Sequence, residues 1–305
     1  MSYIFGPVPS RRLGLSLGID LIPRKTCSYN CIYCQVGKTT DRIMEPSSFV
    51  PVSEVIEEFK EVLEKNPPDV ITLAGSGEPT LNSDIGLIIS ELKKTTSIPV
   101  TLLTNGSLLW NKQVREKITG VDILIPTLSS VYEETYNSIH RPHPGLKLDD
   151  ILKGLKETRK EYKGDFFLEV VLLKGLNDTE EEVSGLKKII KDIKPDKVQL
   201  NTVVRPPSDP GAISLSSERL EEIRDFLGGN AEIIAATPIK NRADKPDSIG
   251  GQVIEMIKRR PVTADDISAS LNIKKAETER IIKGLMIKGQ IQEQRHGADL
   301  FYTAK

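Results

Sequence analysis

A regular alternation of short apolar runs and amphipathic helical segments constrains the fold of this chain more than any other feature of its sequence. Six apolar runs predict strands, and each is followed by a segment with the apolar spacing of a helix. The runs lie at 15–23, 69–75, 98–106, 121–129, 166–175 and 196–204, and the helical segments at 51–65, 83–94, 111–118, 130–138, 148–162, 178–192 and 216–227. Connections of this length suit parallel strands, and near-continuous apolar runs are typical of strands covered on both faces. We therefore predict an α/β fold, either a doubly wound sheet or an incomplete (β/α) barrel, with a short final strand at 231–236.

Polar and glycine-rich segments follow the predicted strands. The three cysteines come after the first strand, and the next five strands are followed by "GSGEPT", "TNGS", "TLSS", "KGLND" and "VVRPP". In both candidate architectures the carboxyl ends of parallel strands meet at one edge, where the chemistry gathers. The sequence therefore predicts a single functional site at that edge.

The three cysteines of this 305-residue chain, Cys27, Cys31 and Cys34, are its only ones and form a C-x3-C-x2-C pattern. A disulfide framework needs an even number of cysteines, and a structural zinc site needs four ligands. The three histidines of the chain show no familiar zinc spacing relative to the cysteines. Thiolates bind zinc, copper(I) or iron–sulfur clusters. A cubane cluster held by three thiolates leaves one iron open to a ligand that is not protein.

The cysteine spacing, with Tyr33 before the last cysteine, resembles that of the radical S-adenosylmethionine (SAM) superfamily. The resemblance covers most of residues 1–240 and includes "GSGEPTL", "TNGSLL", "IHRPHPGLKLDDILKGL" and "VQLNTVVRPP". These segments look like those of the group that includes 4-demethylwyosine synthase, a tRNA guanosine modifier. The resemblance implies a partial (β/α)6 barrel with a [4Fe–4S] cluster at its mouth and SAM on the open iron. Wyosine synthases carry three further cysteines for a second cluster, so this chain resembles a single-cluster relative of unassigned substrate.

The same resemblance implies which residues contact SAM. "GSGEP" matches the glycine-glycine-glutamate motif, in which Gly75 and Gly77 permit close backbone approach and Glu78 accepts a hydrogen bond from the methionine ammonium. Asn105 and Ser129 follow the third and fourth strands, where they are expected to contact the methionine or the ribose, and Tyr33 accompanies the cluster. The alternative is that these residues serve only as turn and cap residues.

Two further residues are candidates for substrate chemistry. His143 in "HRPHPG" is a candidate acid or base, and the alternative is a surface loop made rigid by its prolines. Arg205 in "VVRPP" is a candidate clamp for a phosphate or a carboxylate in the barrel. The alternative for Arg205 is a salt bridge at the end of the barrel, because both uses suit guanidinium geometry.

The character of the chain changes near residue 240. Residues 241–250 are expected to be a linker, and 251–305 predict three helices and a β-hairpin, which is the order of a winged-helix domain. This segment holds ten Lys/Arg and seven Asp/Glu, a net charge of +3, and its basic residues are concentrated in the third helix. The expected partner of this segment is nucleic acid, and the alternative is another protein.

The leading hypothesis is a radical SAM enzyme, and tRNA or another nucleic acid is among the substrates considered. Its partner would be a low-potential electron donor such as ferredoxin or flavodoxin. The alternative is an iron–sulfur redox-sensing DNA-binding regulator, which would need neither "GSGEP" nor a six-unit barrel. With 42 basic and 43 acidic residues the chain has no strong overall field. It shows no signal peptide and no apolar run of 18 residues, so we expect a cytoplasmic protein without membrane contact.

Overall fold

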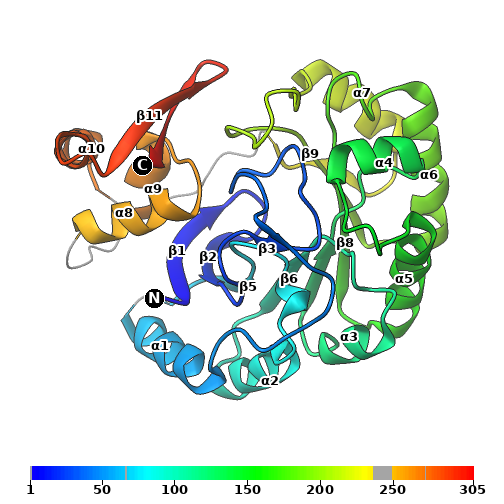
Figure 1. Ribbon diagram of the computed structural model, residues 1–305, viewed down its shortest axis with the longest axis horizontal. Coiled ribbons are helices and arrows are strands. Elements are labelled where there is room, and N and C mark those ends of the chain that lie inside the picture. The colour runs from blue at the N-terminus through cyan, green and yellow to red at the C-terminus, as the bar shows by residue number, and fades with distance from the viewer. Residues whose placement is uncertain (1, 66, 236–248, 272) are drawn as a thin grey trace.

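A curved sheet surrounded by helices forms the larger part of the molecule (Figure 1). The computed structural model describes residues 2–65, 67–235, 249–271 and 273–305. The sheet has the strand order β1-β2-β5-β6-β7-β8-β9-β10, and every neighbouring pair from β2 onward is parallel. Its strands are β1 (Ile4–Ser10), β2 (Gly14–Ile19), β5 (Val70–Leu73), β6 (Val100–Thr104), β7 (Ile123–Pro126), β8 (Asp165–Val171), β9 (Lys197–Asn201) and β10 (Ala231–Ile233).

The helices that connect these strands cover the convex side of the sheet (Figure 1). They are α1 (Val52–Lys65), α2 (Ile85–Thr95), α3 (Lys112–Lys117), α4 (Glu133–His140), α5 (Leu148–Glu161), α6 (Glu180–Ile193) and α7 (Ser217–Leu227). Their apolar faces and the strands share one continuous core; Phe59, Leu73, Ile88 and Leu155 in it are fully buried. All six predicted strand-and-helix units are present, and β10 is the predicted seventh parallel strand.

One strand was not predicted. β1 runs antiparallel to β2 at the edge of the sheet, although its sequence, "IFGPVPS", contains a glycine and two prolines. Proline lacks an N–H group, so it is tolerated in a strand mainly at a sheet edge. The edge position therefore explains how a segment with turn-forming residues can pair as a strand.

The C-terminal residues form a second unit with its own apolar core (Figure 1). Its elements are α8 (Ile249–Arg259), α9 (Ala264–Leu271), α10 (Lys275–Ile287), β11 (Ile291–His296) and β12 (Asp299–Ala304). Three helices and an antiparallel hairpin match the predicted order, and the winged-helix assignment stays a prediction. Helix α8 begins inside the expected linker 241–250, of which residues 241–248 lie outside the described residues.

The second unit packs against the β1 edge of the sheet. Val8 of β1 contacts the core of the C-terminal unit, and α9 lies against β1. An ion pair of 3.2 Å joins Arg259 of α8 to Asp20, which follows β2. Among the described residues, none of the helices has the length and apolar composition needed to cross a membrane.

Candidate functional site

The cysteine loop leaves the sheet after β2 and is held at both ends. Two short strands, β3 (Thr26–Cys27) and β4 (Asp41–Arg42), pair with each other and bracket it. Its middle is tied to the end of α4, because Asn30 N donates to His140 O at 3.0 Å and Ile32 N to Ile139 O at 2.9 Å. The loop therefore has a fixed path across the carboxyl ends of the strands.

The three thiols are half-buried and form no disulfide. Asn105 Nδ2 lies 3.5 Å from Cys27 Sγ, and His140 Nδ1 lies 3.4 Å from Cys31 Sγ. Burial raises the pKa of the Cys27 thiol to about 12, and burial together with the neighbouring cysteines raises the pKa of Cys31 well above its usual value. Thiols in such surroundings ionise only beside a strongly positive partner such as iron.

The donor set fits an iron–sulfur cluster better than a single ion. The three cysteines influence one another electrostatically, so they lie close together. In the described part of the chain, no three or more His, Cys, Asp or Glu side chains are arranged to hold one metal ion. A closed zinc site has four ligands around a single ion, whereas a cubane spreads its thiolates over several irons.

The "GSGEP" segment packs directly beneath this loop. A Cβ atom at Gly77 would lie 1.8 Å from the carbonyl oxygen of Thr26, the residue before Cys27. A Cβ atom at Gly75 would lie 2.3 Å from the Asp20 carboxyl carbon. The close approach that these glycines permit is therefore to the protein itself. Their contact with SAM stays a prediction.

Glu78 is buried and holds three segments together. Its Oε1 accepts hydrogen bonds from Thr80 N (3.0 Å), Thr80 Oγ1 (2.6 Å) and Thr104 Oγ1 (2.6 Å), while Oε2 accepts one from Asn105 N at 2.7 Å. Burial raises the pKa of Glu78, and the hydrogen bonds from Thr104 and Thr80 oppose that rise. Oε2 has one donor within the described part of the chain, so it retains acceptor capacity for an ammonium group.

Asn105 brings the predicted residues together, whereas Ser129 lies apart from them. The Asn105 amide contacts Cys27 and donates to Ser28 Oγ at 2.9 Å, and its backbone N–H binds Glu78. Ser129 is fully buried, and its carbonyl accepts from Asn177 Nδ2 at 2.7 Å. Ser129 is thus fixed on the β7–β8 side of the rim, and its contact with the ribose stays a prediction.

An aromatic cluster supports the cysteine loop from the α4 side. Tyr33 interacts electrostatically with Cys31, and its ring meets that of His140 edge-on. The hydroxyls of Tyr29 and Tyr136 hydrogen bond to each other beside the same imidazole. Burial lowers the pKa of His140 to about 3. His140 stands more than a hundred residues from the cysteines in sequence, so its contact with Cys31 could not be found from spacing.

The two predicted substrate residues occupy different places. His143 is tied over the cysteine loop, because its N–H donates to Ser28 O at 2.8 Å, and its Nδ1 accepts from Gly145 N at 3.1 Å. Arg205 points instead toward the C-terminal unit and lies 3.6 Å from Asp266. The alternative of a salt bridge at the barrel end is therefore present at Arg205. Its role as an anion clamp stays a prediction.

A polar network in the barrel interior was not predicted. Arg12, from the turn between β1 and β2, donates to Glu169 of β8 and to Gln199 of β9, each at 3.0 Å. Glu169 also accepts from Asn201 Nδ2 at 2.8 Å. Glu169 stands alone among apolar neighbours in "FFLEVV", and a charged residue inside a strand predicted to be buried is the signal that could have found it. Arg12 lies in "SRRLG", outside the predicted strands, and carries no such signal.

The comparisons with known proteins agree with this site. The chain matches the family described as the Radical SAM superfamily over residues 21–185. It is 39% identical over 98% of its length to a protein named GTPase Obg from Brachyspira hyodysenteriae, of whose length it covers 45%. It is 32% identical over 99% of its length to a UPF0026 protein of Methanocaldococcus jannaschii, of which it covers 96%.

Among solved structures, the similarity concerns the fold. The structure of TYW1 with a lysine-pyruvate adduct bound superposes with a TM-score of 0.54 at 19% identity. The match covers 73% of this chain and 75% of that one. The predicted partial barrel and the predicted likeness to the wyosine synthase group are thereby confirmed.

A partial barrel with three cysteines at its rim is the arrangement expected of a radical SAM protein, and the chain belongs to the radical SAM superfamily. Within it the chain belongs to the UPF0026 family, since it aligns with members of that family over nearly its whole length. The cofactors are a [4Fe–4S] cluster and SAM, as predicted. The alternative of a DNA-binding redox sensor receives no support from these relatives.

Proposed function

We propose that this chain is an enzyme that abstracts hydrogen from a substrate bound inside the barrel, beside the cysteine loop. The observation that carries the proposal is the position of Asn105, which contacts both Cys27 of the metal-binding pattern and Glu78 of the SAM motif. A [4Fe–4S] cluster on the three thiolates would supply the electron that cleaves SAM to methionine and a 5′-deoxyadenosyl radical. The chain's own residues hold the cysteine loop next to the "GSGEP" loop and exclude water.

The interior network supports a polar substrate. Arg12, Glu169, Gln199 and Asn201 bring donors and acceptors together where a barrel of this size would otherwise be apolar. Glu169 and Cys31 both raise the pKa of Tyr33, so the network acts electrostatically on the cysteine loop. A substrate bound to this network would lie next to the radical source.

Two partners complete the proposal. A low-potential electron donor such as ferredoxin or flavodoxin would reduce the cluster. The C-terminal unit would recruit a nucleic acid substrate, because the basic residues of its third helix and the flanking positions are all exposed: Lys274, Lys275, Arg280, Lys283 and Lys288. Exposed lysine and arginine side chains are the groups that neutralise phosphates.

Anaerobic reconstitution tests the enzyme. We expect about four irons and four sulfides per chain, as for a thiolate-held cubane. With dithionite and SAM the protein should form 5′-deoxyadenosine even without substrate, and omission of dithionite is the control. A single stoichiometric zinc and no 5′-deoxyadenosine would contradict the proposal.

A salt titration tests the recruitment of nucleic acid. Binding of the full-length protein to RNA or DNA should weaken steeply with salt. Replacing Lys274 and Lys283 by alanine should make the salt slope shallower by about one for each lysine that neutralises a phosphate. Replacing Lys93 and Lys117, which lie on the barrel, is the control. If the binding of RNA or DNA does not weaken with salt, the C-terminal unit has a partner other than nucleic acid.

A further inference from the structure

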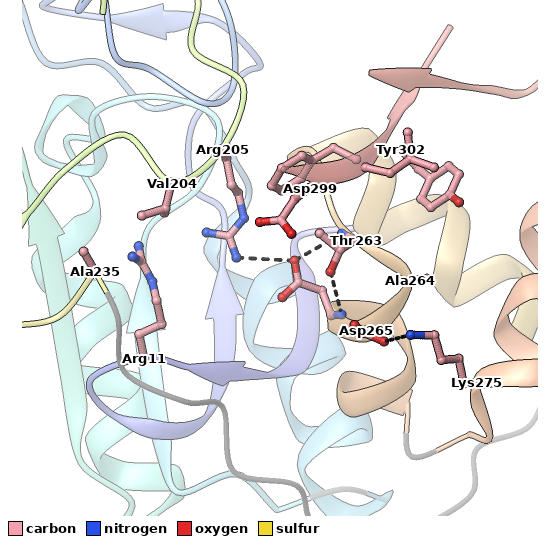
Figure 2. A pocket seen from close by; sticks show the side chains of 13 residues that line it. Arg11, Val204, Arg205, Ala235, Thr263, Ala264, Asp265, Lys275, Asp299 and Tyr302 are labelled. Carbon is pink, nitrogen blue, oxygen red and sulfur yellow. Dashed lines mark hydrogen bonds and ion pairs between the residues drawn. The ribbon is translucent and has the colours of Figure 1, made fainter. Parts of the chain in front are cut away.

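A cavity of about 380 Å³ lies between the barrel and the C-terminal unit (Figure 2). Arg11, from the β1–β2 turn, and Arg205, from the loop after β9, enter it from the barrel side. Thr263 and Asp266 at the start of α9 and Tyr302 of β12 close it from the other side. Pockets of this size hold small organic ligands.

Three guanidinium groups gather at the inner end of this cavity. Arg205 is 7% exposed and Arg11 is partly buried, and both line the cavity. Arg260, which follows α8, is partly buried and interacts electrostatically with both. Burial and the neighbouring arginines lower the pKa of Arg11 to about 10 and that of Arg260 to about 9. Arg11 and Arg260 are therefore still charged at neutral pH, and the neighbouring guanidinium groups repel one another.

These arginines have few partners in the described residues. Arg205 lies 3.6 Å from Asp266, beyond good hydrogen-bond distance, and its buried Nε has no acceptor among the residues that the structure describes. Arg11 makes one long hydrogen bond of 3.3 Å to Asn201. The Arg260 side chain makes no hydrogen bond or salt bridge among the described residues, although it interacts electrostatically with Asp266.

Another buried arginine shows how this chain ordinarily satisfies such a group. Arg115 binds Glu161 through two hydrogen bonds of 2.8 and 3.1 Å and two backbone carbonyls at 3.0 Å. Buried guanidinium groups without such partners are costly. The contrast with Arg11, Arg205 and Arg260 indicates that part of their bonding capacity is kept for a ligand.

The carboxylates of the cavity set the charge of that ligand. Arg11, Arg205 and Arg260 interact with one another and with Asp266, which leaves a net charge of +2, because Arg12 and Glu169, which also act on Arg11, pair with each other. Asp265 pairs with Lys275 at 2.9 Å, and Asp299, which also lines the cavity, is exposed (Figure 2). The inner end therefore favours a group with two negative charges, while the solvated mouth is slightly acidic.

We propose that this cavity binds a terminal phosphate monoester group of the substrate, with Arg11 and Arg205 as its ligands and Arg260 as a further positive charge beside them. The proposal rests on the enzymatic function proposed above and names the chemical class of its substrate. Guanidinium groups match phosphate oxygens in pairs, and a dianion balances the net charge of +2 better than a carboxylate does. The N-terminus of α9 adds a favourable dipole, because its first turn lines the cavity.

The cavity is connected to the cysteine loop. Three residues after Arg205, Ser208 Oγ donates to Cys31 O at 2.8 Å. Arg11 contacts Asn201, which binds Glu169 of the interior network. A phosphate ester anchored by Arg11 and Arg205 would therefore extend its remaining part along the network toward the thiols.

Calorimetry on the full-length protein with inorganic phosphate and with adenosine 5′-monophosphate tests the proposal. Arg205→Gln and Arg11→Gln should each weaken binding of both probes by about tenfold or more, since each removes a charge-assisted hydrogen bond. Arg224→Gln removes an exposed arginine on α7 that pairs with the neighbouring Asp225. This control should change binding by less than about twofold because its charge is screened.

A fourth variant separates anion binding from a merely structural role. Asp266→Asn breaks the same salt bridge as Arg205→Gln but removes a negative charge, and it keeps an oxygen to accept from Thr263 N. We expect Asp266→Asn to strengthen phosphate binding by about two- to fivefold. Weaker binding in both variants would show that the bridge only holds the two units together, and would overturn the proposal.

Two further outcomes decide the chemical class. Acetate should bind at least about tenfold more weakly than phosphate, since it carries one charge instead of two. Acetate binding as tight as that of phosphate, or no saturable binding of either phosphate probe, would overturn the proposal. Formation of 5′-deoxyadenosine without substrate needs the reconstituted cluster, SAM and dithionite but not the cavity, so it would persist if this proposal failed and be absent if the proposed function failed.

Discussion

The rim around the cysteine loop and the cavity beside the C-terminal unit satisfy their polar groups in opposite ways. At the rim, Glu78 accepts four hydrogen bonds and Asn177 makes three, all within the protein. At the cavity, Arg205 and the neighbouring Arg260 have almost no partners in the described residues. A rim whose side chains are bonded mostly within the protein is rigid and suits cofactors of constant shape. An incompletely bonded cavity suits a ligand that arrives and leaves.

Replacing one cysteine is the most severe way to break the rim. Cys31→Ala should reduce bound iron from about four per chain to near zero and abolish 5′-deoxyadenosine formation, since a cubane with two protein ligands is not held. Iron analysis and product chromatography on the reconstituted protein measure both. Cys27→Ala and Cys34→Ala should give the same result, because the chain has no other thiol. Normal iron content in any of the three would contradict the assignment.

Gly77→Ala tests whether the rim is rigid. The added Cβ would lie 1.8 Å from Thr26 O, a backbone atom that cannot move without shifting Cys27. We expect the free energy of unfolding to fall by more than about 3 kcal/mol, as for other severe steric changes. Gly284→Ala in α10 is the control, since its Cβ would meet nothing within 4 Å. It should raise stability by about 0.5–1 kcal/mol, and chemical denaturation compares the two.

Glu78→Gln separates support of the rim from binding of SAM. The side chain keeps its size but exchanges one acceptor oxygen for a donor and loses its charge. We expect unfolding to become easier by about 1–3 kcal/mol and SAM to bind roughly tenfold more weakly, with the cluster retained. Glu78→Ala should also weaken the binding of SAM, but it removes all four hydrogen bonds of the carboxylate as well. Unchanged SAM affinity in Glu78→Gln would make the carboxylate a structural group only.

The smallest effect is expected at the contact between the two units. Arg259 pairs with Asp20 at 3.2 Å and lies over the Phe5 ring at 4.4 Å. Arg259→Gln should lower the free energy of unfolding by about 1–2 kcal/mol without loss of iron, because the pair is mostly shielded from water. Arg224→Gln, which breaks an exposed pair, should cost less than about 0.5 kcal/mol. Equal effects would mean that the Arg259 contact does not stabilise the packing of the units.

Much of the fold could be predicted because apolar runs report burial directly. The β5 segment, "VITL", is buried at every position, so its pattern alone indicates a strand covered on both faces. β1 could not be predicted, because its prolines become compatible with a strand only at a sheet edge. Which strand forms an edge depends on the assembled sheet.

For the site, the residues could be predicted better than their contacts. The cysteine spacing and "GSGEP" indicated the cofactors, and Asn105 does lie between them. Gly77, however, makes room for the Thr26 carbonyl, and Arg205 faces another unit of the chain. Contacts of this kind join residues far apart in sequence, and no local periodicity encodes them.

Asp20 couples the docking of the C-terminal unit to the loop that is predicted to bind SAM. Its carboxylate accepts from the N–H and hydroxyl of Ser76, within "GSGEP", and also from Arg259 of α8. The loop below the cysteines and the C-terminal unit thus share one carboxylate. Linkage is reciprocal: if SAM binding improves the docking of α8 by some factor, docking of α8 improves SAM affinity by the same factor. A ligand that contacts both units would also be coupled to their docking, so its affinity would depend on the presence of SAM.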